Sequence, residues 1–411
     1  MSNIEFYEVK DAKRTVISFT FDIEYKRDDS IKKTLMQRML LNYTNNLKTI
    51  KDYSLKKDEL YIMGCNNELY MDKDRAIYNI YFIIPKVDII KEFNLDDAIS
   101  FIYDTLFNPI VKDEQFEINA FLSELNYLKD KEKDYPHNIG EYASDIFLDF
   151  VDEEKKTLIH YDEYLESLNK TGSKEVYDYY LKNIKSNDYS ICVFGNDEDK
   201  NIILEVLNKY FKPTKPNNRK LNGHEYMPVL DYKKKIIDIN YNQSVLSLFY
   251  QFIELNEEDQ IKLEMLYYFL NSRENDLLYT SLRYKNNFVY HTNVRYSLYF
   301  GMLTLVIFFD YKLLDRIEAE INNLFNELKD KENYDLYKNR LVKAISYDLL
   351  DNLDNPFYVV NDTFNKKYLP DNCLDKKLEI IKTINYESFR EFLDRMMITR
   401  KMIMKSGDTN D

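Results

Sequence analysis

The stretches SKEVYDYYLKNIKSNDYSICVFGND at 173–197 and NYESFREFLDRMMITRKMIMKSGD at 385–408 follow one pattern. Each starts with apolar residues at helical spacing, breaks briefly, and continues as an apolar run of strand length that ends at a Gly close to an acidic residue. A helix, a turn and a strand make a common unit, so the match of these two stretches alone could arise by chance. What precedes each stretch decides whether the chain carries a duplication.

The two halves of the chain run through similar elements before they reach those stretches. In the first half we predict strands at 15–22, 59–72, 76–86 and 188–197, and helices at 30–48, 96–107, 114–130, 138–151, 160–168, 173–185 and 198–210. In the second half we predict strands at 234–241, 245–253, 287–298, 301–309 and 399–408, and helices at 257–271, 311–329, 332–352 and 386–396. The sequence therefore predicts an α+β fold of two homologous domains, each a mostly antiparallel sheet with packed helices.

A segment rich in Pro and Asn separates the halves. KPTKPNNRKLNGHEYMP at 212–228 holds three prolines and has no apolar periodicity, which is typical of a linker. We place the N-terminal domain at 1–212, the linker at 213–225 and the C-terminal domain at 226–411. The length of 411 residues is enough for two such domains.

Composition excludes several classes of function. Seven glycines leave no G-x-G-x-x-G and no G-x-x-x-x-G-K, so the signatures of the common nucleotide sites are absent. The net charge is −14, its excess of carboxylates falls within 91–200, and no basic stripe is present, so we expect no nucleic-acid binding. The acidic segment either keeps its helices solvated or faces a basic peptide. Both interpretations stay open.

The cysteines, histidines and N-terminus give further limits. Three cysteines lie far apart, which predicts a reducing compartment and no disulfide scaffold. No window is apolar enough to span a membrane and the N-terminus has no signal-peptide pattern, so we expect a soluble cytoplasmic protein with no membrane contact. The four histidines are not at ligand spacing, and we expect each to be structural or exposed: His137, His160, His224 and His291.

The layout of paired α+β domains, with a helix at 30–48 after an early strand, resembles the insulinase-like (pitrilysin-type) zinc metallopeptidases. Active members carry H-x-x-E-H, in which two His ligate zinc from one helix face and the Glu activates the metal-bound water. Laid on this helix without a gap, the motif places Thr34 and Arg38 at the His positions and Gln37 at the Glu position. The apolar residues that follow and Thr44 agree with the family.

These departures remove the zinc chemistry. Thr is a poor zinc ligand, Arg is a permanent cation that repels a metal, and Gln cannot take a proton. Glu124, in FEINAFLSEL, matches the family's third ligand by local context, but one carboxylate without imidazoles does not hold zinc. We therefore expect no cofactor in this chain, and we expect Glu124 to be an ordinary surface charge of its helix.

A second family motif is intact. The family's second domain carries L-x-x-x-L-R-x-x-x-x-x-x-Y before a strand, and Arg283 and Tyr290 fall on its Arg and Tyr, with Leu278 and Leu282 at the two Leu positions. The resemblance implies that this pair holds the substrate carbonyl and backbone opposite the zinc. A fixed cation and a phenol can both stabilise charge on a scissile carbonyl oxygen. The alternative is a surface Arg followed by a strand Tyr.

Some bacterial members of the family split the enzyme between two half-size chains that together form a clamshell, one with the zinc motif and one with the Arg/Tyr pair. The sequence is similar to the second kind. We expect a subunit that binds peptide, is inactive alone, and acts in peptide processing or degradation with a zinc-bearing homologous partner. The alternatives are a structural scaffold subunit, or a stand-alone peptide-binding homodimer.

Overall fold

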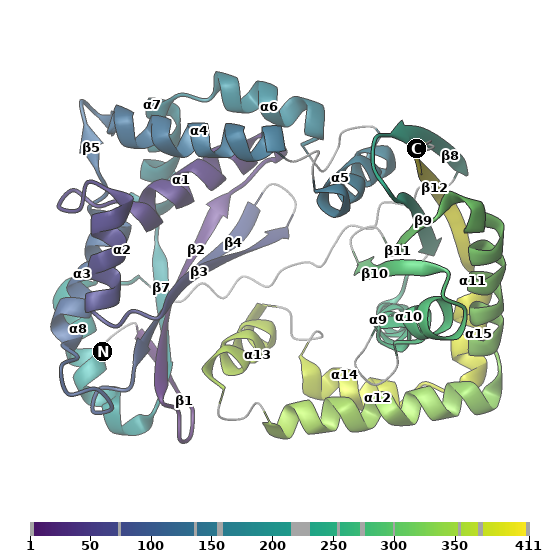
Figure 1. Cartoon of the computed structure of the whole chain (residues 1–411). Helices are drawn as coiled ribbons and strands as arrows, with labels where there is room; N and C mark the ends of the chain where they lie inside the picture. Colours follow the sequence, from purple (N-terminus) through teal and green to yellow (C-terminus); the bar gives the residue numbers. More distant parts are fainter. Residues whose placement is uncertain are drawn as a thin grey trace. The chain divides into compact units, whose positions relative to one another are not determined.

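The computed structural model describes residues 4–72, 75–134, 138–153, 159–214, 231–252, 255–271, 276–298, 301–351, 355–368 and 373–407. They fall into two compact units (Figure 1). Unit 1 draws its described residues from 1–134, 159–223 and 351–370, and unit 2 draws them from 135–158, 224–350 and 371–411. The predicted linker at 213–225 lies, apart from its first two residues, outside the described residues. The domain boundaries therefore stay a prediction.

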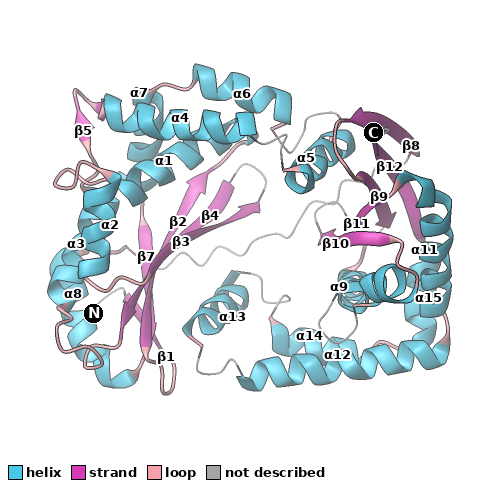
Figure 2. Ribbon diagram, in the orientation of Figure 1, coloured by secondary structure: helices cyan, strands magenta, loops and turns pink. Residues whose placement is uncertain are grey.

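Unit 1 is built on a five-stranded sheet with the order β1-β7-β2-β4-β3. Its strands are β1 (Ile4–Glu8), β2 (Arg14–Glu24), β3 (Gly64–Asp72), β4 (Arg75–Pro85) and β7 (Tyr189–Gly195). Its helices, in cyan in Figure 2, are α1 (Ser30–Asn42), α2 (Ile50–Glu59), α3 (Leu95–Phe107), α4 (Ile118–Asp134), α6 (Tyr161–Lys170), α7 (Ser173–Tyr180), α8 (Lys200–Tyr210) and α13 (Pro356–Tyr368). A short hairpin, β5 (Val111–Lys112) and β6 (Gln115–Phe116), precedes α4.

Unit 2 is built on a second five-stranded sheet with the order β10-β11-β9-β12-β8. Its strands are β8 (Lys233–Ile239), β9 (Ser244–Phe252), β10 (Val289–Ser297), β11 (Met302–Phe309) and β12 (Met396–Ser406). Its helices are α5 (Ile139–Val151), α9 (Glu257–Asn271), α10 (Leu277–Tyr279), α11 (Leu314–Leu328), α12 (Lys331–Asp351), α14 (Leu374–Thr383) and α15 (Tyr386–Asp394).

The two sheets have one topology, which confirms the predicted duplication. In each, the first strand pairs parallel with the last strand, as β1 does with β7 and β8 with β12. The remaining neighbours are antiparallel, so each sheet is mostly antiparallel, as predicted. By this correspondence β3 matches β10, and both are edge strands of their sheets. The helix after the central strand is α1 in unit 1 and α9 in unit 2.

Each sheet is covered on one face by a helix from the other half of the sequence. In unit 1, Phe357 and Val360 of α13 pack against Val16, Cys192 and other side chains on one face of the sheet, while the opposite face forms the main core with α1, α3 and α8. In unit 2, Phe147 of α5 packs in the same manner with Phe249 and its neighbours. Because both faces of the sheet are covered at its centre, all nine residues of β9 are buried, and its sequence does not alternate strictly between apolar and polar residues.

Helix α1 ends earlier than its apolar pattern suggested. The sequence predicted a helix to residue 48, but α1 ends at Asn42 and Tyr43 is extended. The hydroxyl of the buried Thr44 accepts hydrogen bonds from the backbone N–H of Asn46 at 3.3 Å and of Leu47 at 3.0 Å. Such a local side-chain bond to the backbone offers an alternative to helical bonding and ends the helix.

Two other predicted boundaries were wrong for local reasons. The strand predicted at 59–72 begins only at Gly64, because α2, started by the side chain of Thr49, runs to Glu59. The helix predicted at 114–130 begins at Ile118, because Asp113 and Glu114 adopt positive φ and close the hairpin of β5 and β6.

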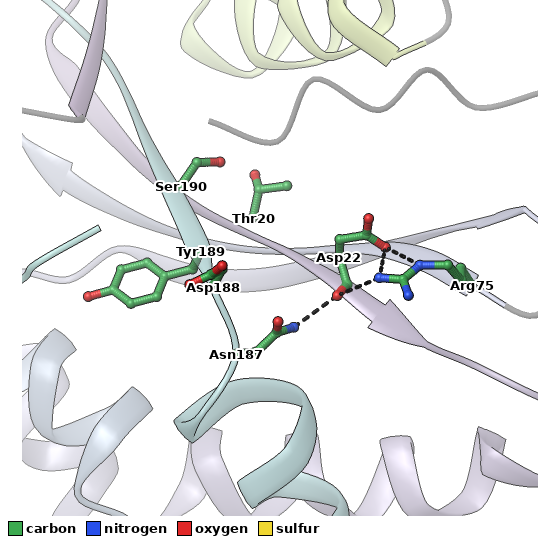
Figure 3. A pocket seen from close by; sticks show the side chains of 7 residues that line it. All are labelled: Thr20, Asp22, Arg75, Asn187, Asp188, Tyr189 and Ser190. Atoms are coloured by element: carbon green, nitrogen blue, oxygen red, sulfur yellow. Dashed lines mark hydrogen bonds and ion pairs between the residues drawn. The ribbon is translucent and has the colours of Figure 1, made fainter. Parts of the chain in front are cut away.

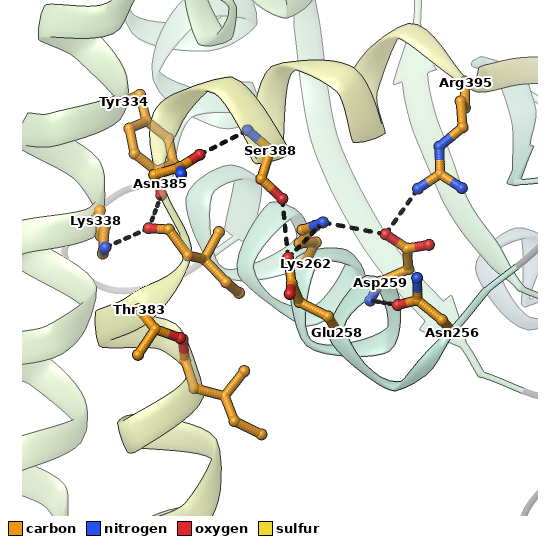
Figure 4. A network of polar contacts seen from close by, with 12 residues as sticks. Asn256, Glu258, Asp259, Lys262, Tyr334, Lys338, Thr383, Asn385, Ser388 and Arg395 are labelled. Atoms are coloured by element: carbon orange, nitrogen blue, oxygen red, sulfur yellow. Dashed lines mark hydrogen bonds and ion pairs between the residues drawn. The ribbon is translucent and has the colours of Figure 1, made fainter.

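A network of polar contacts joins α9 to α15 in unit 2 (Figure 4). Asp259, 1% exposed, accepts from Lys262 Nζ at 3.2 Å and from a guanidinium nitrogen of Arg395 at 2.7 Å. The hydroxyl of Ser388 on α15 donates to Glu258 at 2.9 Å. These contacts hold the start of α9 against α15, and both α10 and β10 pack against α9.

No helix in the described part of the chain is long and apolar enough to cross a membrane.

Candidate functional site

The helix face that would carry a zinc motif lies on α1. Leu35, Met36 and Met39 of α1 are buried in the core of unit 1. Residues 32–34, 37 and 38 are half-buried and therefore lie on the other side of the helix. Thr34, Gln37 and Arg38 all belong to that half-buried face.

Thr34 and Gln37 make contacts within the helix. The Thr34 hydroxyl donates to the backbone carbonyl of Ser30 at 2.9 Å, one turn earlier. The Gln37 side-chain oxygen accepts from Lys33 Nζ at 3.3 Å, and the same Nζ donates to the side-chain oxygen of Asn67 on β3 at 3.1 Å. These two positions therefore serve helix and strand contacts, and neither presents a metal-binding group.

Arg38 and Glu124 form an ion pair, which corrects the prediction that Glu124 is a surface charge. Glu124 is 1% exposed, and its Oε2 accepts from Arg38 Nε, while Oε1 accepts from Asn42 Nδ2 at 3.0 Å. Residue 124 lies on the face of α4 that packs toward α1, so burial there needs a counter-charge. Arg38 supplies it, and its guanidinium carbon lies 4.0 Å from the centre of the Tyr127 ring.

The donor set around Arg38 does not fit a zinc ion. Of the four positions that the resemblance pointed to, only Glu124 carries a metal-binding group, and it is engaged by a permanent cation. Across the described residues there is no group of three or more His, Cys, Asp and Glu side chains that could hold a metal ion. Next to this site Tyr43 is buried, and this burial raises its pKa to about 12.

Arg283 is hydrogen-bonded to the backbone at the residue that precedes Tyr290. Arg283 lies in a π-helical turn at 280–285 that continues α10. One of its terminal nitrogens donates to the carbonyl of Val289 at 2.9 Å and to the side-chain oxygen of Asn287 at 2.9 Å. Asn287 adopts φ 51°, which turns the chain from the helix into β10. The guanidinium is therefore anchored to the residue just before Tyr290.

Tyr290 is the extra residue of a β-bulge on an edge strand. Val289 pairs with Phe309 and His291 with Phe308, so Tyr290 has no partner in β11. Its side chain is 52% exposed. A bulge commonly redirects a side chain next to a functional site. At this position it places a phenol at the free edge of the sheet.

The four edge strands differ in how far they are protected. On β8 the exposed Lys233, Lys234 and Lys235 protect the edge with charge. The edge strand β1 is only five residues long. The matching edges β3 and β10 are longer and have no such lysine run. These two edges are consequently the ones that could accept an added extended peptide.

The cysteines and histidines add no second site in the described chain. All three cysteines are free thiols, and burial raises the pKa of Cys192 to about 12. His160 is buried at the start of α6, and the His291 ring lies 5.8 Å from that of Phe308. The other two histidines, His137 and His224, lie outside the described residues.

A polar pocket of about 280 Å³ lies at one end of the sheet of unit 1 (Figure 3). Its central feature is Asp22, whose carboxylate accepts from Arg75 at 2.9 and 3.0 Å. Asn187 donates to the Asp22 backbone carbonyl at 2.9 Å. The remaining lining residues are Thr20, Asp188, Tyr189 and Ser190. Arg75 is already paired with Asp22 and the lining contains no His or Cys, so this pocket has no Ser or Cys nucleophile paired with a His base.

Sequence reasoning missed the partner of Arg38 and the contact of Lys33 with β3. The signal for the first was present: Leu125 and Leu128, with Phe121, set the buried face of α4, and residue 124 falls on it. The second needed the register of β3, in which residue 67 shares a face with Cys65 and Leu69, both of which pack on the core. That register follows from sheet pairing and is not local information.

Part of the chain matches a model of a known protein family. Residues 172–344 match the family model described as "Peptidase M16 inactive domain". No curated protein sequence matches the chain. M16 is the insulinase-like, pitrilysin-type peptidase family.

Solved structures share the fold over the full chain. A conserved protein from Enterococcus faecalis V583 has a TM-score of 0.78 at 15% identity, over 100% of this chain and 98% of that one. A peptidase M16 inactive domain from Pseudomonas fluorescens has a TM-score of 0.64 at 12% identity, over 99% and 96%. The periplasmic protease PqqL from Escherichia coli has a TM-score of 0.63 at 10% identity, over 97% of this chain but 43% of that one.

The duplicated sheets, the degenerate metal motif on α1 and the matched family model lead to one assignment. Over its full length the chain has the fold of the M16-type structures, and its residues 172–344 resemble the inactive domain of the M16 (insulinase-like, pitrilysin-type) peptidases.

Proposed function

We propose that this chain is the non-zinc subunit of a heterodimeric peptidase, which binds peptide and presents Arg283 and Tyr290 to a zinc site on a homologous partner. The observation that supports the proposal is the anchored pair: Arg283 is held on the carbonyl of Val289, and Tyr290, at the bulge of an edge strand, is half-exposed.

The length of the chain supports a partnership. This chain aligns over 97% of itself with only 43% of the E. coli protease. A protease of that length has room for a second part of similar size. The proposal is that here the second part is a separate chain, and that this partner carries the intact H-x-x-E-H.

Arg283 and Tyr290 would act as donors to the substrate. One terminal nitrogen of Arg283 donates to the Val289 carbonyl and to the Asn287 side chain. Its other two nitrogens make no hydrogen bond within the described chain. The Tyr290 hydroxyl likewise has no bond among the described residues. Both can therefore donate to a peptide carbonyl oxygen and stabilise the negative charge that builds on it during hydrolysis. The partner's zinc site would supply the nucleophilic chemistry.

The edge of β10 offers a way to hold the peptide. An extended segment added to β10 would pair with backbone groups that β11 does not use, and it would run past the bulge at Tyr290. Binding through the main chain suits a protein that accepts peptides of varied sequence, because most of its hydrogen bonds do not depend on side chains.

Co-expression with half-size homologues that carry H-x-x-E-H tests the proposal. We expect a 1:1 complex on size-exclusion chromatography at micromolar concentration and cleavage of a quenched fluorescent peptide by the complex. Each chain alone should be inactive. If the chains elute separately, the heterodimer is wrong. If a complex forms and cleavage is unaffected by changes at Arg283 and Tyr290, the chain is a scaffold.

A further inference from the structure

Asn287 links the side chain of Arg283 to the turn that leads into β10. Its side-chain oxygen accepts from a terminal nitrogen of Arg283 at 2.9 Å, and its backbone N–H donates to the Arg283 carbonyl at 2.9 Å. The same terminal nitrogen of Arg283 donates to the Val289 carbonyl at 2.9 Å. One nitrogen of the guanidinium therefore meets two acceptors, both of which lie beyond the π-helical turn at 280–285 that carries Arg283.

The turn requires the backbone of Asn287 but not its side chain. Asn287 adopts φ 51°, the left-handed conformation in which helices commonly end, and glycine adopts this conformation at no steric cost. The backbone N–H of Phe288 donates to the Leu282 carbonyl at 2.8 Å, so the turn is closed by main-chain bonds. What asparagine adds to glycine here is a side-chain acceptor, and Arg283 uses it.

The second acceptor fixes the orientation of the guanidinium. Val289 alone would hold the nitrogen at one point, about which the side chain can still turn. Asn287 supplies a second point, and because a guanidinium is planar its other nitrogens are then fixed as well. Those two nitrogens make no hydrogen bond within the described residues. A donor that is already in place when charge develops on a carbonyl oxygen costs no reorganisation during the reaction.

We propose that Asn287 is a positioning residue for Arg283, whose side-chain oxygen holds the guanidinium in the orientation that stabilises charge on the substrate carbonyl. The proposal rests on the proposed function, because it assumes that Arg283 contacts the substrate. Asn287 acts through Arg283 and not on the peptide. Its loss should therefore impair turnover more than peptide binding.

Asn287→Gly isolates the side chain on the purified full chain. It keeps the left-handed turn, so the temperature of unfolding should stay within about 3 °C of the native value. Phenylglyoxal modifies guanidinium groups, and peptide mapping follows its reaction with Arg283. We expect Arg283 to react about five-fold faster in the variant, which corresponds to the loss of a hydrogen bond of about 1 kcal/mol.

Two further variants assign this effect to the oxygen of Asn287. Asn287→Asp keeps an acceptor at the same position and tolerates the left-handed conformation, so Arg283 should react as slowly as in the native chain. Asn196→Gly is the matched control, because it deletes an Asn oxygen that accepts from the backbone N–H of Glu198 in unit 1. It should leave the reaction of Arg283 unchanged.

Kinetics of the complex with the zinc-bearing partner test the role in turnover. Asn287→Gly should lower kcat about ten-fold and leave KM within about two-fold of native, the pattern of a contact made in the transition state. In a chain that already carries Arg283→Ala, the added Asn287→Gly should change kcat by less than about two-fold, because the group that it positions is gone.

The outcomes separate the two proposals. Failure to form a complex, or cleavage that Arg283→Ala leaves unchanged, contradicts the proposed function. If Arg283→Ala lowers cleavage and Asn287→Gly does not, the proposed function stands and the positioning role is overturned. An unchanged phenylglyoxal reaction in Asn287→Gly also overturns it, and this measurement needs no partner. So does an equal loss of kcat from Asn287→Gly with and without the Arg283 side chain.

Discussion

Arg38 Nε donates to the buried carboxylate of Glu124 at the place where the family's metal motif would put a zinc ligand beside an acidic ligand. The guanidinium thus provides, in fixed form, the positive charge that a metal would provide. This explains why Glu124 can stay buried although the rest of the motif has changed. The pair holds α1 against α4. The two helices therefore stay packed together although the zinc-binding residues are absent.

Removal of Arg38 should destabilise the chain. Arg38→Met leaves the Glu124 carboxylate buried without a counter-charge, and we expect a loss of about 1–3 kcal/mol in the free energy of unfolding. The double variant Arg38→Met/Glu124→Met should recover most of it, because both charges are gone. Urea unfolding followed by circular dichroism measures both. As a control, Arg390→Met, whose pair with Asp394 at 4.0 Å is exposed, should change little. Equal effects at 38 and 390 would refute the account.

Restoring the motif should restore metal binding. The native chain should carry no stoichiometric zinc, because Thr34, Gln37 and Arg38 supply no ligand. The triple variant Thr34→His/Gln37→Glu/Arg38→His should retain about one zinc per chain, because the carboxylate of Glu124 contacts residue 38 and would serve as the third ligand. Elemental analysis after dialysis gives the ratio. Adding Glu124→Gln to the triple variant should lower zinc retention. One zinc per native chain would contradict our interpretation of the site.

Tyr290→Phe should slow peptide cleavage by the assembled complex by about a hundred-fold. The change deletes one hydroxyl and keeps the ring, so the complex should still elute as one species. Arg283→Ala should cost at least as much, because it removes a charge with several donors. Gln37→Ala is the matched control and should leave turnover unchanged. Cleavage within about two-fold of native for both changes, in an intact complex, would show that the pair only packs.

Cys192 should resist alkylation while α13 covers it. Its pKa is raised by burial to about 12, so at pH 8 the thiol is almost entirely protonated and unreactive. We expect iodoacetamide to label it at least a hundred-fold more slowly in the native chain than in urea. Val360→Asp puts a charge in the apolar contact of α13 and should speed labelling. Lys366→Ala, at an ion pair on the exposed side of α13, should not. Peptide mapping separates Cys192 from Cys65 and Cys373.

Sequence patterns located most elements because their apolar periods are strong. Helix α9 was predicted at its observed bounds, 257–271, and β9 and β11 within one residue at each end. Helices α2, α13 and α14 were missed. The apolar residues of α13 and α14 contact segments far away in the sequence, as Val360 contacts Val16. A local sequence pattern does not indicate such a partner.

The candidate site was predictable in part. The identities of Thr34, Gln37 and Arg38 were enough to argue against a metal, because ligand chemistry depends on residue type. The pairing of Arg38 with Glu124 depends on the packing of two helices 86 residues apart in sequence. The bulge at Tyr290 depends on the register between β10 and β11. Long-range packing and register are tertiary properties, and a single sequence carries little trace of them.

Because α13 from the second half of the sequence covers the unit 1 sheet, this sheet is synthesised long before the helix that covers it. When a ribosome has completed α8, the unit 1 sheet has all its strands, but α13 lies about 150 residues further on. At a synthesis rate of about 5–20 residues per second, α13 would be made about 8–30 s after α8. Until then one apolar face of the unit 1 sheet stays exposed. During that interval Val16, Cys192 and Phe194 are open to wrong partners. A nascent chain of this design should therefore depend on chaperones until residue 368 has left the exit tunnel.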